Sequence, residues 1–317
     1  MMKHKLSFRD DRTFTITQFT DIHWMDGRAE DQQSRRLMET VLDVEKPDLV
    51  VFTGDVIYTG NVTPGKPICE RPAQALQEAV HAAELRGIPW AIVFGNHDTE
   101  NRITRKELMD VVISHEHTVS QHGDDLLSGV GNYALHIDGS DDQPAAALYF
   151  FDSGAYSPAP SVPGYDWIRN DQIQWYANES RKLRARMNGR TLPALAFLHI
   201  PLPEYKEVWE TTVCFGNKFE DVCCARVNSG LFASMVEMGD VLGTFAGHDH
   251  INDYWGELHG IRLCYGRATG YNTYGKEGFP RGARMIRLRE GERSFETWLR
   301  LADGSVIGRQ PEHHPNA

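Results

Sequence analysis

Residues 90–98 read WAIVFGNHD, a run of five apolar residues that passes directly into Gly95, Asn96, His97 and Asp98. A short apolar run rich in β-branched and aromatic residues is typical of a strand buried on both faces. Polar side chains placed where such a strand ends are costly without partners. This stretch therefore predicts a strand that delivers a polar site at its carboxyl end.

Four further apolar segments of the chain also end in polar residues. Amphipathic helical patterns separate several of them, for example at 37–42 and 73–86. This strand–helix alternation predicts an α/β layered fold, and such folds place ligands at the carboxyl ends of their strands. The segments and the residues that follow them are FTITQF at 14–19 before Asp21 and His23, LVVF at 49–52 before Asp55, LAFL at 195–198 before His199, and VLGTFA at 241–246 before His248 and His250.

The chain has 317 residues and no stretch that reads as a linker, so we expect a single domain spanning 1–317. Several strands joined by Gly-rich turns are predicted for 254–298, where they would form a second sheet edge. The Pro- and Gly-rich stretches 61–72 and 156–164, together with 201–227, are predicted to be long surface loops. Loops of this length often shape a substrate site.

The composition excludes several classes of protein. Charged residues make up 24% and hydrophobic residues 41%, as in soluble globular proteins, and no apolar run approaches the roughly 20 residues of a membrane span. The net charge of −11 disfavours general binding to nucleic acid, although acidic groups gathered locally can hold metal cations. The N-terminus shows no apolar signal-peptide segment and the five cysteines read as reduced thiols, so we predict a cytoplasmic protein.

The spacing of the polar residues favours convergence on one site. In an extended segment residues i and i+2 point to the same side, so Asp21 and His23 should converge, and so should His248 and His250. Asp55 follows a glycine, which permits a tight exit from the strand. Taken singly, these signals are as typical of turns and surfaces as of a site, but all five strand ends together favour a metal. Carboxylates, imidazoles and one amide oxygen suit Zn, Mn or Fe.

Together these motifs resemble the calcineurin-like metallophosphoesterase superfamily. The likeness is closer still to a branch related to purple acid phosphatases, which includes plant proteins labelled "probably inactive" purple acid phosphatases and a fungal phosphatase. It implies a four-layer α/β sandwich, in which two mixed β-sheets pack face to face with helices on the outside, and a binuclear metal centre. The stretches that carry it are EKPDLVVFTGDVIY at 45–58, IPWAIVFGNHDTE at 88–100, VPGYDWI at 162–168, FLHIPLPEY at 197–205 and VNSGLFASMVEMGDVLGTFAGHDHINDYWGELHGIRLCYG at 227–266.

The resemblance also implies a role for each residue at the strand ends. Two metal ions, with Mn, Fe or Zn as the candidates, would share Asp55 as a bridging ligand. His97 would be a catalytic residue that binds no metal, and Asp98 would orient its ring. The first ion is expected on Asp21, His23 and His250, and the second on Asn96, His199 and His248.

One position departs from the purple acid phosphatases. Those enzymes lack a histidine at the place of His23 and use a tyrosine three residues after the bridging aspartate. This chain has His23 and also Tyr58 at that tyrosine position. Because both side chains would crowd one six-coordinate ion, we expect His23 to be the ligand and Tyr58 to line the pocket.

The function that the resemblance implies is hydrolysis of small phosphate mono- or diesters. A metal-bound hydroxide would attack phosphorus, Asn96 would contact the phosphoryl group with His97, and His97 would assist the leaving group. Tyr58 and Arg102 are further candidates for substrate contact, with packing and solvated surface as the competing interpretations. The alternative function is a catalytically weak, metal-stabilised binding scaffold. Monoester, diester, nucleotide and phosphoprotein substrates stay open, as do the metal identity and the oligomeric state.

Overall fold

The computed structural model describes residues 4–60 and 67–315, and in these residues the strands form two mixed sheets. The six-stranded sheet has the order β13 (Val306–Ile307), β12 (Phe295–Leu301), β11 (Gly282–Arg289), β1 (Thr13–Phe19), β2 (Leu49–Thr53) and β3 (Trp90–Val93). The eight-stranded sheet has the order β14 (Glu312–His313), β7 (Cys214–Phe215), β9 (Trp255–Leu258), β10 (Ile261–Tyr265), β8 (Val241–Ala246), β6 (Ala194–Phe197), β5 (Pro144–Phe150) and β4 (Tyr133–Asp138).

The strands that precede the predicted site residues run parallel to their neighbours. β1, β2 and β3 form a parallel set, with Ile16 beside Leu49, and β5, β6, β8 and β10 form another, with Leu148 beside Leu195. Parallel neighbours end at the same edge of a sheet. The polar residues that follow these strands are therefore gathered at one edge of each sheet.

Side-chain alternation along the strands divides the apolar residues between two layers. Leu49 and Val51 of β2 belong to the cluster between the two sheets, together with Phe197 of β6. Val50 and Phe52 belong to the cluster on the outer face of the six-stranded sheet. Because both faces of the sheet are covered, β2 is apolar at its first four positions, which is why that run in the sequence is continuous.

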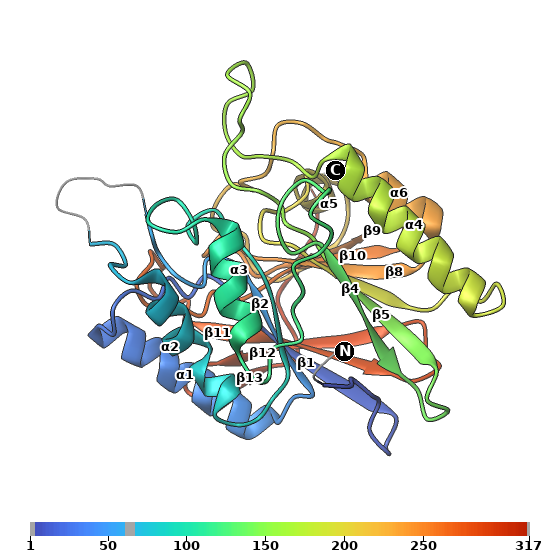
Figure 1. The fold of residues 1–317 in the computed structure, drawn as a ribbon, viewed down its shortest axis with the longest axis horizontal. Helices are drawn as coiled ribbons and strands as arrows, with labels where there is room; N and C mark the ends of the chain where they lie inside the picture. Colours follow the sequence, from blue (N-terminus) through green and yellow to red (C-terminus); the bar gives the residue numbers. More distant parts are fainter. Residues whose placement is uncertain (1–3, 61–66, 316–317) are drawn as a thin grey trace.

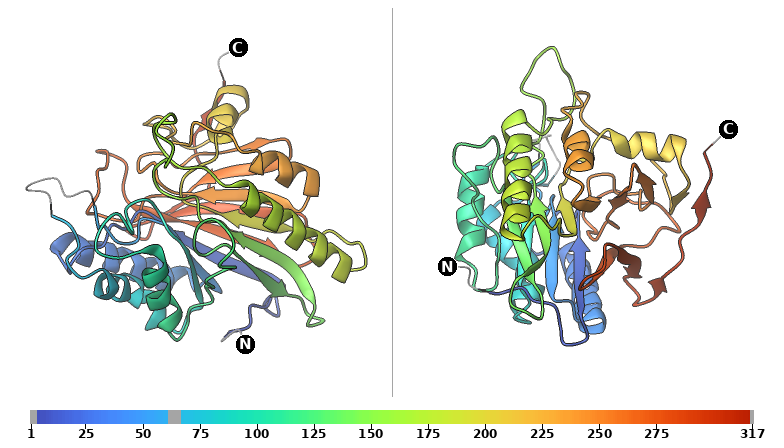
Figure 2. Two further views of the ribbon diagram at one scale, coloured as in Figure 1. Left: turned by 45° about the horizontal axis from the view of Figure 1, so that its top comes forward. Right: turned by 90° about the vertical axis from the view of Figure 1, so that its right-hand side faces the viewer.

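Helices cover the outer face of each sheet, which gives the four layers that the resemblance implied (Figure 1, Figure 2). The helices α1 (Ala29–Glu45), α2 (Pro72–Glu84) and α3 (Arg105–Ser114) pack on the six-stranded sheet. The helices α4 (Asn170–Arg186), α5 (Glu204–Thr211) and α6 (Leu231–Met238) pack on the eight-stranded sheet. The predicted fold class is confirmed. Among the described residues, no helix combines the length and the apolar character needed to cross a bilayer.

Two predictions about the second half of the chain need correction. The stretch 254–298 does not form one sheet edge, because β9 and β10 join the eight-stranded sheet while β11 lies beside β1 inside the six-stranded sheet. The stretch 201–227 is not all loop, since it contains α5 and β7. The stretch 156–164 is a loop, and it projects at the top of Figure 1. Of the predicted loop 61–72, residues 61–66 lie outside the described part of the chain.

Candidate metal centre

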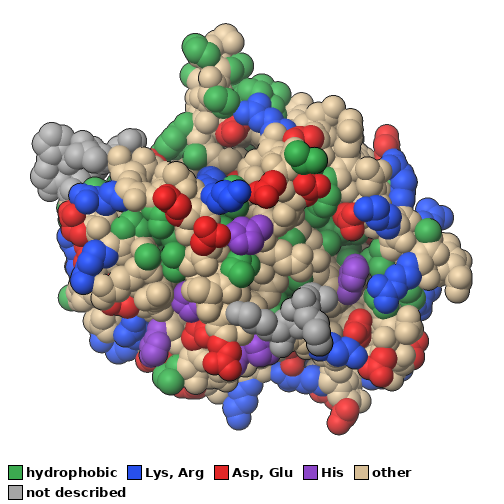
Figure 3. Space-filling model, in the orientation of Figure 1, with side chains coloured by type: hydrophobic (Ala, Val, Ile, Leu, Met, Phe, Trp, Pro, Cys, Tyr) green, Lys and Arg blue, Asp and Glu red, His purple; other side chains and the backbone are tan. Residues whose placement is uncertain are grey.

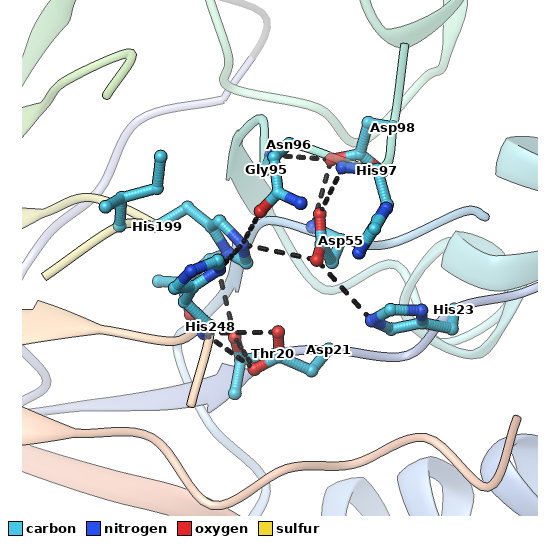
Figure 4. A network of polar contacts seen from close by, with 12 residues as sticks. Thr20, Asp21, His23, Asp55, Gly95, Asn96, His97, Asp98, His199 and His248 are labelled. Carbon is cyan, nitrogen blue, oxygen red and sulfur yellow. Dashed lines mark hydrogen bonds and ion pairs between the residues drawn. The ribbon is translucent and has the colours of Figure 1, made fainter. Parts of the chain in front are cut away.

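The structure brings all seven predicted ligands to one buried place between the sheet edges. Asp21 and His23 follow β1, Asp55 follows β2, and Asn96 follows β3, while the three remaining histidines follow β6 and β8. Figure 4 shows side chains from both sheets directed toward Asp55. The seven residues, each at most 6% exposed, are Asp21, His23, Asp55, Asn96, His199, His248 and His250.

Four of these residues form a first cluster. One ligand atom each of Asp21, His23, Asp55 and His250 lie within 4.8 Å of one another. His23 Nε2 is 3.4 Å from Asp55 Oδ2, and His250 Nε2 is 3.4 Å from Asp21 Oδ1. Two carboxylates and two imidazoles converging at this spacing match the mixed N/O donor sets that bind Zn, Mn or Fe.

The second cluster is centred on His199. Its Nε2 atom lies 3.3 Å from Asp55 Oδ2, 3.2 Å from Asn96 Oδ1 and 3.2 Å from His248 Nδ1. Asp55 Oδ2 therefore belongs to both clusters, whereas Asp55 Oδ1 accepts the backbone N–H of His97 at 2.8 Å. One carboxylate oxygen shared between two ligand clusters is the arrangement expected of a bridging ligand.

The hydrogen bonds show which atoms are left free for an ion. His199 Nδ1 is 2.8 Å from the carbonyl oxygen of Thr53, which can only accept, so Nδ1 carries a proton and Nε2 of the neutral ring presents a lone pair. Among the described residues, Asp55 Oδ2, His23 Nε2 and His248 Nε2 are buried without a hydrogen-bond partner. A buried polar atom without a partner costs about 1–3 kcal/mol. Cations at the two clusters would satisfy Asp55 Oδ2 and His23 Nε2, whereas His248 faces the second cluster through Nδ1. The residues therefore fit a binuclear centre.

The electrostatics of the clusters also favour positive charge. Burial alone would raise the pKa of Asp55, but His199 and His97 hold it well below its usual range. Burial alone would lower the pKa of His199, but Asp55 and Asp21 raise it to about 9. Burial lowers the pKa of His23 to about 4 and that of His248 to about 3. The latter two rings are thus neutral, which is the form of imidazole that binds metals.

The backbone at the strand ends is strained. Asp21, His23, Asp55 and His248 have φ values of 54°, 52°, 48° and 79°. The first two residues thus converge from left-handed backbone, and the prediction of an extended segment there was wrong, although the side chains do meet. Such conformations cost of order 1–3 kcal/mol each and are typical of functional sites.

Glycines allow the strand ends to approach each other. Gly54 has a φ of 86°, and a Cβ atom on it would lie 2.4 Å from Nδ1 of His199. A Cβ atom on Gly95 would lie 2.1 Å from Oδ1 of Asp55. Both distances are far below van der Waals contact, so Asp55 can lie beside His199 only because these two positions carry no side chain.

Comparison with known proteins shows the family of the chain. A family model described as calcineurin-like phosphoesterase matches residues 14–252. The chain belongs to this family. It is 35% identical to "Probable inactive purple acid phosphatase 29" of Arabidopsis thaliana, over 97% of this chain and 88% of that protein. It is 33% identical to "Phosphatase DCR2" of Saccharomyces cerevisiae, over 94% of this chain and 55% of that protein.

Solved structures support the fold of this calcineurin-like phosphoesterase. A dimetal phosphatase from Danio rerio superposes with a TM-score of 0.58 over 90% of this chain and 98% of that chain, at 16% sequence identity. At this identity the likeness concerns the fold alone. The arrangement of two mixed sheets with outer helices is therefore shared with a phosphatase of the same architecture.

The expected role of Asp98 is wrong in the structure. Its carboxylate accepts the backbone N–H groups of Gly95 at 2.7 Å, Ile57 at 2.9 Å and Asp55 at 3.0 Å. The His97 ring is held instead by Glu100, with 2.7 Å between Nδ1 and Oε2. Asp98 is buried, and by accepting these three N–H groups it joins the segment that follows β2 to the segment that follows β3. The N–H groups would otherwise lack a partner. Burial, with Asp55 nearby, raises the pKa of Asp98 to about 6.

Tyr58 and Arg102 differ in where they point. The Tyr58 ring stacks on His23 with 5.4 Å between ring centroids and lies 5.0 Å from the His97 ring. Tyr58 is therefore beside the candidate ligands. Arg102 instead pairs with Glu70, its Nη2 atom 2.9 Å from Oε2, and its side chain is 43% exposed. The guanidinium is thus engaged on the surface with a carboxylate.

Some residues at the site were missed by sequence reasoning. Tyr156 contacts Asn96, the Tyr165 ring lies perpendicular to the His248 ring with 4.4 Å between centroids, and Thr273 contacts Nδ1 of His250 at 2.5 Å. Glu100 carried one available signal, since it lies three residues after His97 on the same strand exit. The other three come from loops whose path the local sequence does not specify.

Proposed function

We propose that this calcineurin-like phosphoesterase holds two metal ions and hydrolyses small phosphate mono- or diesters. The observation that carries the proposal is the sharing of Asp55 Oδ2 by two buried ligand clusters, beside a histidine that belongs to neither. The first ion would be held by Asp21, His23, His250 and Asp55. The second would be held by Asp55, Asn96, His199 and His248.

When bound, two such ions lower the pKa of a water molecule and stabilise the charge on the phosphoryl oxygens. The residues of the chain supply the rest of the chemistry. Asn96, whose Oδ1 faces the second cluster, would also contact the phosphoryl group through an N–H of its amide. His97, whose Nδ1 faces Glu100, has Nε2 free to donate a proton to the leaving oxygen.

The charge of His97 supports the role of proton donor. Burial alone would lower its pKa, but Asp55 and Glu100 raise that pKa above its ordinary value. Without bound metal, the ring is thus imidazolium over a wider pH range than a free histidine, and Glu100, which binds no ion in this proposal, continues to favour that form. General acid assistance of this kind contributes about 10²–10⁴-fold to the rate.

The charge of the molecule supports a small substrate over a nucleic acid. The net charge is −11, and on the face shown in Figure 3 Lys and Arg side chains are interspersed with Asp and Glu. A nucleic acid backbone needs a continuous basic surface. The cytoplasmic location and the absence of a membrane role stay predictions, as does the extension of one domain over 1–317.

The second candidate function is a metal-stabilised binding scaffold with weak or no catalysis. The observation that favours it is the naming of three Arabidopsis thaliana relatives as probable inactive purple acid phosphatases. Against it stands the chain's own set of residues, since every ligand position and His97 are filled by residue types able to perform the reaction.

A substrate panel distinguishes the two candidates. The protein, freed of metal with a chelator, is assayed alone and after addition of Mn²⁺, Zn²⁺ or Fe²⁺ on an aryl monoester, an aryl diester, an alkyl monoester, a nucleotide and a phosphoserine peptide. We expect hydrolysis only with metal. Full activity without metal would contradict the two-metal proposal, and tight metal binding without hydrolysis of any substrate would favour the scaffold.

A further inference from the structure

The hydroxyl of Tyr156 lies between two residues of the β3 exit. It is 2.5 Å from Glu100 Oε1 and 3.3 Å from Asn96 Nδ2. A carboxylate can only accept and the amide nitrogen can only donate. The hydroxyl therefore donates its proton to Glu100 and accepts a hydrogen bond from Asn96.

This contact fixes which way the Asn96 amide faces. With Nδ2 engaged by Tyr156, Oδ1 is turned to the opposite side, where it lies 3.2 Å from Nε2 of His199. Only the oxygen of an amide can serve as a metal ligand, because the nitrogen has no free lone pair. A tyrosine outside both ligand clusters thus presents the correct atom of Asn96 to the second cluster.

The other oxygen of Glu100 fixes the His97 ring. Oε2 lies 2.7 Å from Nδ1 of His97, so the neutral ring carries its proton on Nδ1 and leaves Nε2 unprotonated. The carboxylate is only 4% exposed, although the His97 side chain is 26% exposed. Charge-assisted hydrogen bonds to a sheltered carboxylate are the stronger kind. One carboxylate therefore connects His97 to Tyr156 and, through it, to Asn96.

The backbone on both sides of this chain of contacts is anchored. Thr59 Oγ1 accepts the backbone N–H of Glu100 at 2.9 Å and donates to the carbonyl of His97 at 2.8 Å. Arg105 donates from Nη2 to the carbonyls of Gly95 at 2.9 Å and Gly154 at 2.7 Å. The same guanidinium pairs with the buried Asp152 at 3.2 Å. Arg105 thus joins the segment before Asn96 to the segment before Tyr156, which keeps the hydroxyl in reach.

We propose that Glu100 and Tyr156 are positioning residues that form a clamp from Asn96 to His97. The clamp turns the Asn96 oxygen toward the second cluster and the His97 proton toward Glu100. It connects the proposed metal ligand Asn96 to the proposed proton donor His97 through Tyr156, which lies in the loop between β5 and α4. Its two roles rest on the proposed function, but the geometry that it fixes can be measured without any activity.

The first measurement is the tautomer of His97 in the metal-free protein. Side-chain ¹⁵N shifts are recorded with labelled histidine at a pH where the ring is neutral, and His97→Ala assigns the signal. We expect the Nδ1–H tautomer in the wild type, a shift toward Nε2–H in Glu100→Ala, and its retention in Glu100→Gln, whose amide oxygen can still accept. An unchanged tautomer in Glu100→Ala, with folding confirmed by circular dichroism, would overturn the clamp.

The second measurement is the affinity for metal in Tyr156→Phe, with Tyr149→Phe as the matched control. The Tyr149 hydroxyl also donates to a buried carboxylate, Asp240 Oδ2 at 3.0 Å, but among the described residues neither Tyr149 nor Asp240 belongs to a ligand cluster. Titration calorimetry with Mn²⁺ alone should show one of two ions bound about 10-fold more weakly in Tyr156→Phe, as expected when a group that orients a ligand is lost. The control should match the wild type.

The outcomes separate the clamp from the proposed function. Equal Mn²⁺ affinities in Tyr156→Phe and Tyr149→Phe would remove the clamp even if the enzyme is fully active. A wild type that binds Mn²⁺ but hydrolyses no substrate would remove the proposed function, while the tautomer and the affinity difference would still support the clamp. In an active enzyme, Tyr156→Phe should lower kcat more than it raises KM, because it disturbs positioning rather than binding.

Discussion

The strand ends and the surrounding loops contribute to the site in different ways. The seven residues at the strand ends are at most 6% exposed, and four of them have positive φ values. From the loops, Tyr156 and Tyr274 touch the same site while 44% and 54% exposed. The sheets fix the first group by backbone hydrogen bonds, whereas a few side-chain contacts hold the second. We infer that the strand ends supply the chemistry and the loops adjust it.

The largest effect should come from the residue that both clusters share. Asp55→Asn removes the charge that faces His23 and His199 and should abolish hydrolysis, with a loss on the order of 10³-fold or more, and empty both metal positions. Metal analysis and turnover on an aryl phosphate check this. Asp125→Asn is the matched control, since that carboxylate is 83% exposed and should be silent. An Asp55→Asn protein with two ions bound would contradict the bridging role.

His97→Ala tests the difference between binding metal and moving a proton. His97 lies beside the strand-end ligands but belongs to neither metal cluster among the described residues. We expect near-normal metal content and a loss of about 10²–10⁴-fold on alkyl phosphate esters, with a smaller loss on activated aryl esters, whose leaving groups need no proton. An emptied metal position would make His97 a ligand. Equal losses on both ester types would leave it a positioning group.

The strand-end residues and Tyr156 show which parts of the site the sequence could predict. The strand-end set was readable because each member directly follows a short apolar strand, and parallel strands end at a common edge. Tyr156 was not readable, because it contacts Asn96 and Glu100 across 60 and 56 residues of chain. The same reason applies to the fold, where the alternation of strands and helices was legible but the division of 254–298 between two sheets was not.

Asp98 shows a subtler limit of sequence reasoning. A carboxylate next to a catalytic histidine suggests a partner for its ring, yet the three backbone N–H groups at the strand exits take both of its oxygens. Adjacent residues at a tight turn point in different directions, and Glu100, three residues after His97, reaches the ring instead. Only the three-dimensional path of the exit decides between the two carboxylates.

Asp98→Ala should therefore reduce stability as well as activity. It would leave three buried N–H groups without an acceptor, each costing about 1–3 kcal/mol, so a decrease of about 3 kcal/mol or more in the free energy of unfolding is expected. Urea unfolding of the metal-free protein measures it without interference from metal binding. Glu107→Ala, which removes a capping contact at the exposed start of α3, should cost about 1 kcal/mol and serves as the comparison. Equal stability in the two variants would mean that Asp98 does not join the strand exits.

The smallest change in turnover is expected from substitution of Tyr58, which lies three residues after Asp55 in the segment that follows β2. Its ring stacks on His23 with 5.4 Å between ring centroids. In the metal-free protein, burial together with Glu100 and Asp55 raises the pKa of Tyr58. With His23 already directed at Asp55, the Tyr58 ring is left to pack against His23.

Tyr58→Phe should thus keep the metal content and change turnover by only a few fold. In the iron-loaded protein, a strong visible band that this substitution abolishes would show the tyrosine to be a ligand and would place it with the strand ends instead.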